Sequence, residues 1–291
     1  MRSRTQLTIP SCRSFTVQAL LLGLASGTAL PAQVDAREII RRAVAADELN
    51  WKTARNYGFT QRVDLRRLDP QGRVKSREVK IFDVMLLDGS PYRRLAGRDD
   101  RPLPPGDEKK EQEKLSKSIA ERRKESAAQR AIRLTEYESR PEWQREAWRE
   151  LPEAFNFRLV NEENWDGNGV YVIEATPRQG CQPRSRTAKV LAHVQGKLWV
   201  HKQDYHLVKA EVEVIETISV GLFLVRLAKG TRAVFEQSRV DDEVWLPRRV
   251  QLSASARVGL LKVLHIEHEV TYSKCREFQT APLVMSRLRP R

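Results

Sequence analysis

Apolar and polar residues alternate with a period of two over much of the chain, most regularly between Gly196 and Phe278. Successive side chains of a β-strand point to opposite faces, so this alternation predicts strands with one dry face and one wet face. Short polar turns separate the runs. They favour an antiparallel meander, because parallel strands need crossovers of a dozen residues or more. The first run is a predicted hairpin whose second strand places Val208, Ala210, Val212 and Val214 on the dry face.

The same rhythm returns near Val250 and again near Leu264, after a break at Gly259. Between the hairpin and these runs, the segment 218–227 is too apolar for an exposed loop. We interpret it as a short buried helix or loop that enters the mouth of the curved sheet. Many of the inward residues are small, so we expect a cavity over the dry face, although the same residues would also suit an ordinary packed core. The predicted lining is Val208, Ala210, Val212, Val214, Leu222, Phe223, Leu252, Ala254 and Ile266.

The N-terminal half contains a helix, further strands and a charged insertion. Apolar residues recur on one face over 35–54, which predicts an amphipathic helix that covers a sheet. Strands follow from Asn56, with turn residues at Asp69-Pro70-Gln71-Gly72. Residues 107–150 hold 23 charged residues in 44, twelve basic and eleven acidic, which predicts a solvated helical excursion. It is either a surface insertion or a docking arm or lid.

The first 33 residues have the pattern of a secretory signal. Three arginines and no acid precede an apolar run from Phe15 to Leu30, and small residues follow at possible cleavage sites after Ala29 or Ala32. An uncleaved anchor is the alternative, but about sixteen apolar or small residues are short for a membrane span of about twenty. We therefore expect a signal peptide at 1–33, one mature domain at 34–280 with a helical insertion at 105–152, and a flexible tail at 281–291.

Composition and charge narrow the partners of the mature chain. The chain has 291 residues, 40% of them apolar, which is enough for a real core. Its net charge is +14, of which the three arginines of residues 1–33 supply three, so the mature chain carries +11. A positive net charge of this size usually indicates a nucleic-acid partner. Because the signal predicts export, we do not expect nucleic acid. An anionic membrane surface, a glycan or an acidic envelope protein is the more reasonable partner.

A basic loop and two cysteines are further candidates for binding or cross-linking. The loop after Pro177 carries a basic cluster without acids, which could grip a phosphate or a carboxylate or simply be an exposed loop. This cluster is Arg178, Arg184, Arg186 and Lys189. Cys181 and Cys275 could form a disulfide in an oxidising compartment, but nothing in the sequence brings them together.

No set of residues predicts catalysis. His265 and His268 are three apart, so on a strand they point to opposite faces and cannot chelate one metal ion. His201 and His206 flank a predicted turn and could meet, which we interpret as surface chemistry rather than a metal site. The sequence contains no phosphate-binding glycine loop and no nucleophile elbow. We expect no enzyme activity, no cofactor and no metal.

The order of elements and several sequence blocks resemble the LolA/LolB-like superfamily of bacterial periplasmic lipoprotein carriers, and within it a group of exported proteins. The blocks are Asp88–Leu95, Ile173–Pro177, Leu198–Tyr205, Ile218–Phe223 and Val244–Arg249, and the Trp-x-x-x-x-Asp-Tyr and Trp-Leu-Pro pieces are the most specific. The resemblance implies an α+β fold: a curved, unclosed β-barrel of about ten mainly antiparallel strands, covered by helices, with a periplasmic location. The chain departs from the family at His201, where an acidic residue is usual, and in its helical insertion.

Two functions from different classes follow. The first is an exported periplasmic binding protein whose concave face holds the acyl chain of a lipid or lipoprotein. The second is an envelope protein-interaction or sensor module with a filled core and no lipid cavity, which would bind through the helical arm and the basic loops.

Overall fold

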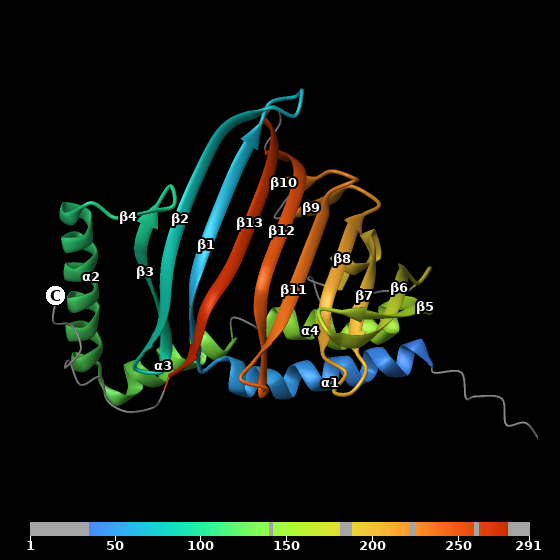
Figure 1. The fold of residues 1–291 in the computed structure, drawn as a ribbon, viewed down its shortest axis with the longest axis horizontal. Coiled ribbons are helices and arrows are strands. Elements are labelled where there is room, and N and C mark those ends of the chain that lie inside the picture. Colours follow the sequence, from blue (N-terminus) through green and yellow to red (C-terminus); the bar gives the residue numbers. More distant parts are fainter. Residues whose placement is uncertain (1–34, 140–141, 181–187, 221–224, 259–261, 279–291) are drawn as a thin grey trace, which may run out of the picture. The chain divides into compact units, whose positions relative to one another are not determined.

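One large antiparallel sheet organises the chain. The computed structural model describes residues 35–139, 142–180, 188–220, 225–258 and 262–278. The sheet has thirteen strands along the path β4-β3-β2-β1-β13-β12-β11-β8-β7-β6-β5, with β10 paired to β12 and β9 paired to β10 (Figure 1). The strands are β1 (Tyr57–Leu68), β2 (Val74–Leu87), β3 (Ser90–Arg98), β4 (Arg101–Pro102), β5 (Phe155–Trp165), β6 (Asn168–Pro177), β7 (Val194–His201), β8 (Leu207–Val214), β9 (Ile218–Val220), β10 (Val225–Leu227), β11 (Arg232–Val240), β12 (Val244–Val258) and β13 (Lys262–Glu277). The helices are α1 (Ala36–Ala54), α2 (Pro105–Lys124), α3 (Ala127–Ser139) and α4 (Glu142–Ala154), with a 3₁₀ helix η1 (Ala188–His193).

The predicted α+β fold with an unclosed, mainly antiparallel sheet and a charged helical insertion is confirmed. The sheet has three strands more than the ten that the sequence predicts, and β4, β9 and β10 are only two or three residues long. Strands of that length are too short to display a period of two. The predicted signal peptide and the tail from 279 onward lie outside the described residues.

The expectation of a helix or loop at 218–227 is wrong for the residues that the structure describes there. Ile218–Val220 and Val225–Leu227 pair with each other as a hairpin, and β10 also pairs with Ala256–Val258 of β12. The segment is apolar because it extends the sheet, and Ile218 is buried in the main core. Leu222 and Phe223 lie outside the described residues.

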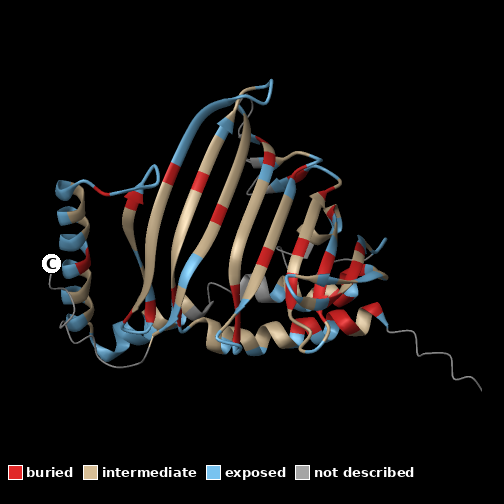
Figure 2. Cartoon of the chain, viewed as in Figure 1, coloured by how far each residue is buried: buried red, intermediate tan, exposed pale blue. Residues whose placement is uncertain are grey.

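Helices α1 and α4 cover one part of the sheet. Asp35 caps α1 by accepting a hydrogen bond from the backbone N–H of Arg37 at 2.9 Å. Ile39 and Ile40, each 1% exposed, pack with Trp148 of α4 in a cluster with side chains from β5 to β8. Figure 2 shows buried residues concentrated in α1 and in this part of the sheet, whereas the long strands β1, β2, β12 and β13 are mostly of intermediate exposure.

The helical insertion is fixed to the turn between β2 and β3. Arg133 of α3 donates to the hydroxyl of the buried Ser90 at 2.6 Å and to the carbonyl of Asp88 at 3.3 Å. Arg122 of α2 donates to the carbonyls of Leu87 and Ser90. Two arginines from two helices therefore hold α2 and α3 against one edge of the sheet.

The face of β1 that points away from α1 carries a buried carboxylate. Asp64 is 2% exposed and accepts hydrogen bonds from Arg77 at 2.7 Å, Arg66 at 3.3 Å and Arg62 at 3.5 Å. The hydrogen bonds from Arg77 are the largest cause that lowers the pKa of Asp64, and they outweigh its burial; the pKa falls to about 2. Three arginines thus share one ionised carboxylate.

Replacing Asp64 with asparagine should lower the free energy of unfolding by about 3 kcal/mol at pH 7, because it leaves three arginines without their buried counter-charge. The pKa of this carboxyl is depressed on folding, so its contribution is complete above about pH 4 and is lost as the pH falls towards 2. Urea unfolding from pH 5 to pH 2.5 should show the wild type and Asp64→Asn converging. Glu162→Gln, which removes an exposed partner of Lys202, is the control. A difference that stays constant with pH would contradict the assignment.

Candidate functional site

The face of the sheet under α1 and α4 continues past them as an apolar surface. The strand register aligns Ala210 of β8 with Phe235 of β11, Val250 of β12, Val270 of β13 and Val63 of β1. Directly paired residues of neighbouring strands share a face. The apolar and aromatic residues that this register places on the continuation, which we call the apolar face, are Phe59, Val63, Leu65, Phe82, Leu95, Phe235, Val250, Leu252, Ala254, Ile266, Val270 and Tyr272.

Most of the large side chains on the apolar face are only half-buried. Phe59, Leu65, Phe82 and Ile266 are all of intermediate exposure. The buried cluster under α1 and α4 reaches along the sheet as far as Phe235; among the described residues it includes none from β12, β13, β1 or β2. The sheet therefore keeps a broad apolar surface that this core does not enclose.

The predicted ligand-binding residues divide between this face and the core. Leu252, Ala254 and Ile266 lie on the apolar face, and Ala254 pairs directly with Ile266. Ala210 and Val214 are buried in the cluster under the helices, and Val212 packs against that cluster. Ala210 and Val214 therefore belong to a filled core.

Val208 does not lie on the face of the sheet that the sequence predicts for it. The pairing of β7 with β8 shifts between Trp199 and Val200, so that Val200 lies opposite Leu207 and Val208 becomes the extra residue of a β-bulge. Val208 consequently packs with Trp199 and Trp245 in a second cluster, on the other face from Ala210. Alternation in the sequence cannot reveal a bulge, because it assumes that every residue has one partner.

The predicted anion-binding loop is described only in part. Arg178 is exposed immediately after β6. Arg184 and Arg186 lie outside the described residues, and so does the side chain of Lys189, whose backbone belongs to η1. Cys181 is also outside them, while Cys275 is half-buried against Tyr57 and Val244.

The sequence analysis did not assign the N-terminal strands to the site. β1 pairs with β13, so Phe59 meets Tyr272 in an edge-to-face contact with ring centroids 5.1 Å apart. Alternation in β1 is visible in the sequence, and this signal marks Phe59, Val63 and Leu65 as one face. Only the pairing of the first strand with the last places them beside Ile266 and Leu252.

Polar groups also lie on this face. The register places Lys80 opposite Val63, Glu78 opposite Leu65, and His268 between Leu65 and Leu252.

Three further polar groups lie nearer the β3 edge. The guanidinium carbon of Arg93 stacks 3.5 Å from the centroid of the Phe82 ring. Gln61 donates to the hydroxyl of Tyr272 at 3.5 Å. Burial lowers the pKa of Arg93 and raises the pKa of Tyr272. Tyr272 is half-buried, whereas Arg93 remains exposed.

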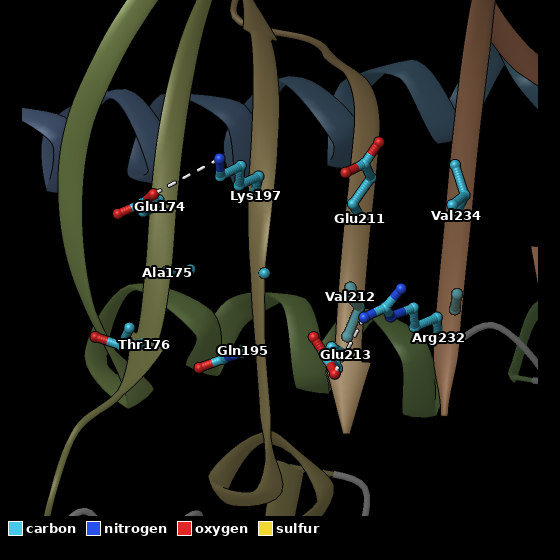
Figure 3. A pocket seen from close by; sticks show the side chains of 12 residues that line it. Glu174, Ala175, Thr176, Gln195, Lys197, Glu211, Val212, Glu213, Arg232 and Val234 are labelled. Carbon is cyan, nitrogen blue, oxygen red and sulfur yellow. Dashed lines mark ion pairs between the residues drawn. The ribbon is translucent and has the colours of Figure 1, made fainter. Parts of the chain in front are cut away.

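The opposite face of the sheet is polar. It carries an open depression of about 480 Å³ over β6, β7, β8 and β11, with Glu174, Lys197, Glu211 and Arg232 in its lining (Figure 3). Lys197 pairs with Glu174 at 3.7 Å, and Arg232 pairs with Glu213 at 3.6 Å. A second depression, of about 250 Å³, includes Asp64 in its lining. Charged side chains line both depressions, and the second also includes Leu252.

Two of the sequence blocks meet at the end of β7. Asp204 accepts a hydrogen bond from the indole N–H of Trp245 at 3.0 Å and lies 2.6 Å from Nδ1 of His201. Asn50 of α1 exchanges two hydrogen bonds with the backbone of Trp245, at 2.7 and 2.9 Å. The Trp-x-x-x-x-Asp-Tyr and Trp-Leu-Pro blocks thus join β7, β12 and α1.

The interpretation of the two histidines of this region as surface residues is wrong for His201, which is 3% exposed. The His201 and His206 rings both contact Trp245, with centroids 5.5 and 5.8 Å away. Burial opposes ionisation of Asp204, but hydrogen bonds from Trp245, His201 and the backbone of His206 outweigh it and lower its pKa. Burial lowers the pKa of His206. This geometry is that of a structural joint.

Within the described ranges, no group of three or more His, Cys, Asp or Glu side chains could hold a metal ion. No helix in the same ranges is both long enough and apolar enough to cross a membrane.

The chain has structural likenesses among solved proteins. It is similar to a domain described as an outer membrane lipoprotein-sorting protein domain of Vibrio parahaemolyticus, with a TM-score of 0.36 and 11% identity over 84% of this chain and 95% of the other. It is also similar to a LolA superfamily protein of Nitrosomonas europaea, with a TM-score of 0.33 and 12% identity over 86% and 96% of the two chains. A third likeness is to the MucA/MucB complex of Pseudomonas aeruginosa, with a TM-score of 0.24 and 12% identity over 84% of this chain and 99% of that one.

No family model matches the chain, and no curated protein is significantly similar to it. The likenesses to solved structures lie at only 11 to 12% sequence identity. At these TM-scores they carry no argument about function, which must come from the geometry of the sheet.

The joint around Asp204 predicts a pH-dependent stability. Because burial depresses the pKa of His206, the unfolded chain takes up a proton there at a higher pH than the folded chain. Stability should therefore decline as the pH falls below about 6.5, the ordinary pKa of histidine. Urea unfolding between pH 7.5 and pH 5 should show a shallower decline for His206→Gln than for the wild type. His193→Gln, at the surface beside Glu216, is the control. An unchanged slope in His206→Gln would contradict the prediction.

Proposed function

We propose that the protein is an exported, periplasmic binding protein that holds the acyl chain of a lipid or lipoprotein on its apolar face. The observation that carries the proposal is the run of large, half-buried apolar side chains across β11, β12, β13, β1 and β2. Exposed apolar surfaces of this breadth are characteristic of binding sites, since monomeric proteins rarely leave them open without function.

The dimensions of the face suit a long apolar chain. Five strands spaced about 4.8 Å apart give a surface about 20 Å wide. Its side chains are aliphatic at Leu65, Leu252 and Ile266 and aromatic at Phe59, Phe82 and Phe235. Burying each methylene of an acyl chain contributes about 0.8 kcal/mol, and this contribution needs no reactive group. We therefore propose binding rather than catalysis.

The predicted signal at 1–33 supports export and a periplasmic location. Its basic start, apolar run and small residues are the parts of a secretory signal. A lipid or lipoprotein in transit through an aqueous compartment would expose its acyl chains to water. A protein with an unenclosed apolar face provides a place for them.

A binding assay on matched variants tests this proposal. Native mass spectrometry of gently purified protein should show co-purified lipid, and a fluorescent acyl probe should bind the delipidated protein. Leu252→Arg and Leu65→Arg place a charge on the apolar face and should weaken probe binding about tenfold or more, equivalent to about 1.4 kcal/mol. Gln251→Arg is the matched control, because Gln251 lies next to Leu252 on the opposite face and hydrogen bonds to Glu269.

Circular dichroism must first show that the three variants are folded. Equal probe binding by Leu252→Arg, Leu65→Arg and the wild type would contradict the proposal. A folded wild type that carries no lipid and binds no probe would favour the second function, a protein-interaction module. Deletion of residues 107–150 should then abolish binding to its protein partner.

A further inference from the structure

Arg93 and Arg94 are adjacent in β3 but lie in opposite electrostatic environments. Arg94 pairs with Asp83 at 2.8 Å and with Glu108 at 2.6 Å, on the polar face of the sheet. Arg93 points to the apolar face, where it stacks on Phe82. Among the described residues, no carboxylate forms an ion pair with Arg93. One arginine is therefore satisfied by two acids, and its neighbour presents an unpaired charge beside apolar side chains.

Arg93 is exposed, and its surroundings on the face are aromatic and apolar. The register places Arg93 opposite Val84 of β2, and Val84 opposite Phe59 of β1. The next row of the same face holds Leu95, Phe82, Gln61 and Tyr272, in that order across the strands. Burial lowers the pKa of Arg93, and the hydroxyl of Tyr272 only partly opposes this. A guanidinium stays charged in this setting, so its unused donors favour an anion.

The donors at this position suit an anionic head group. The stack on Phe82 holds the guanidinium plane over the ring, and the edge of that plane keeps its N–H groups free for a carboxylate or a phosphate. The Gln61 amide and the Tyr272 hydroxyl lie on the same face one row away. A few polar groups at the margin of an apolar surface are what fixes the orientation of a ligand.

We propose that Arg93 anchors the anionic head group, a carboxylate or a phosphate, of an amphiphile whose acyl chain lies on the apolar face. This inference rests on the proposed function and adds the class of ligand: an anionic lipid in preference to a neutral one. The chain then runs from Arg93 across β2, β1 and β13 towards Leu252, and the head group remains at the β3 edge of the sheet.

Competition against a fluorescent acyl probe tests the assignment with three ligands of one chain length. Palmitate carries a carboxylate, 1-palmitoyl lysophosphatidic acid carries a phosphate, and palmityl alcohol is neutral. The wild type should bind at least one of the two anions about tenfold more tightly than the alcohol, which is the contribution expected of one charge-assisted contact. Tighter binding of palmitate would indicate a fatty acid as the ligand, and tighter binding of the lysophosphatidic acid would indicate a phospholipid.

Arg93→Gln should weaken binding of the preferred anion about tenfold and change binding of the alcohol by less than twofold. Arg93→Lys should recover part of the loss, because lysine keeps the charge and loses the planar fork. The control is Arg73→Gln, which removes an exposed arginine that pairs with Asp69 in the turn between β1 and β2, away from the apolar face, and should leave all three ligands unaffected.

The outcomes separate this inference from the proposed function. Equal affinity for all three ligands, unchanged in Arg93→Gln, would overturn the head-group assignment and leave the acyl-binding function intact. Equal losses for the anions and the alcohol in Arg93→Gln would also overturn it, because the arginine would then act only through packing. Failure of the wild type to bind any of the three would overturn the acyl-binding function and the head-group assignment together.

Discussion

The structure depends on one geometric constraint: the apolar face of the sheet is wider than the helices that cover it. An α-helix of 19 residues is about 28 Å long and crosses about six strands spaced about 4.8 Å apart. The main path of the sheet has eleven strands. Helix α1 packs mainly on β5, β7 and β12, and its last residue, Ala54, reaches only the cluster around Tyr57 and Val244 at the ends of β1 and β12, so α1 leaves most of β13, β1 and β2 uncovered. The apolar face persists because the covering layer ends.

The two faces of the sheet differ in the side chains that they carry. On the polar face, carboxylates and arginines pair across strands, as Asp64 does with Arg77 and Glu269 does with Arg249. These pairs give long strands a solvated surface without exposing apolar groups. On the other face, the same strands present half-buried leucine, valine and phenylalanine. One sheet thereby combines a charged side with a half-buried apolar side, and Arg93 lies on the apolar side at its β3 edge.

Much of the fold could be predicted from the sequence because its signals are local. Alternation with a period of two located the long strands, turn residues such as Asp166-Gly167 separated them, and a helical period located α1. Charge density located the insertion that became α2, α3 and α4. The Leu252, Ala254 and Ile266 part of the apolar face followed from the same alternation. Each of these features is encoded by consecutive residues, the strands and α1 within about twenty and the insertion within 44.

The remainder depends on information that adjacent residues do not carry. The bulge at Val208 arises from pairing between β7 and β8, and it moves that side chain to the other face. The pairing of β1 with β13 joins residues about 200 positions apart and brings Phe59 to Tyr272. Ala210 packs in the cluster of Ile39 and Ile40 of α1, whereas α1 meets β12 at Trp245, so Leu252 farther along that strand stays half-exposed. The sequence analysis treated Ala210 and Leu252 as equivalent.

Paramagnetic NMR tests the central claim most directly. Protein labelled at its methyl groups would be mixed with a fatty acid that carries a nitroxide on its acyl chain. Our account predicts strong line broadening of the methyl signals of Leu65, Leu252 and Ile266, and little broadening of Val234 on the polar face or of Ile39 under α1. Broadening centred on Val234, or none at any of these methyl groups, would contradict it.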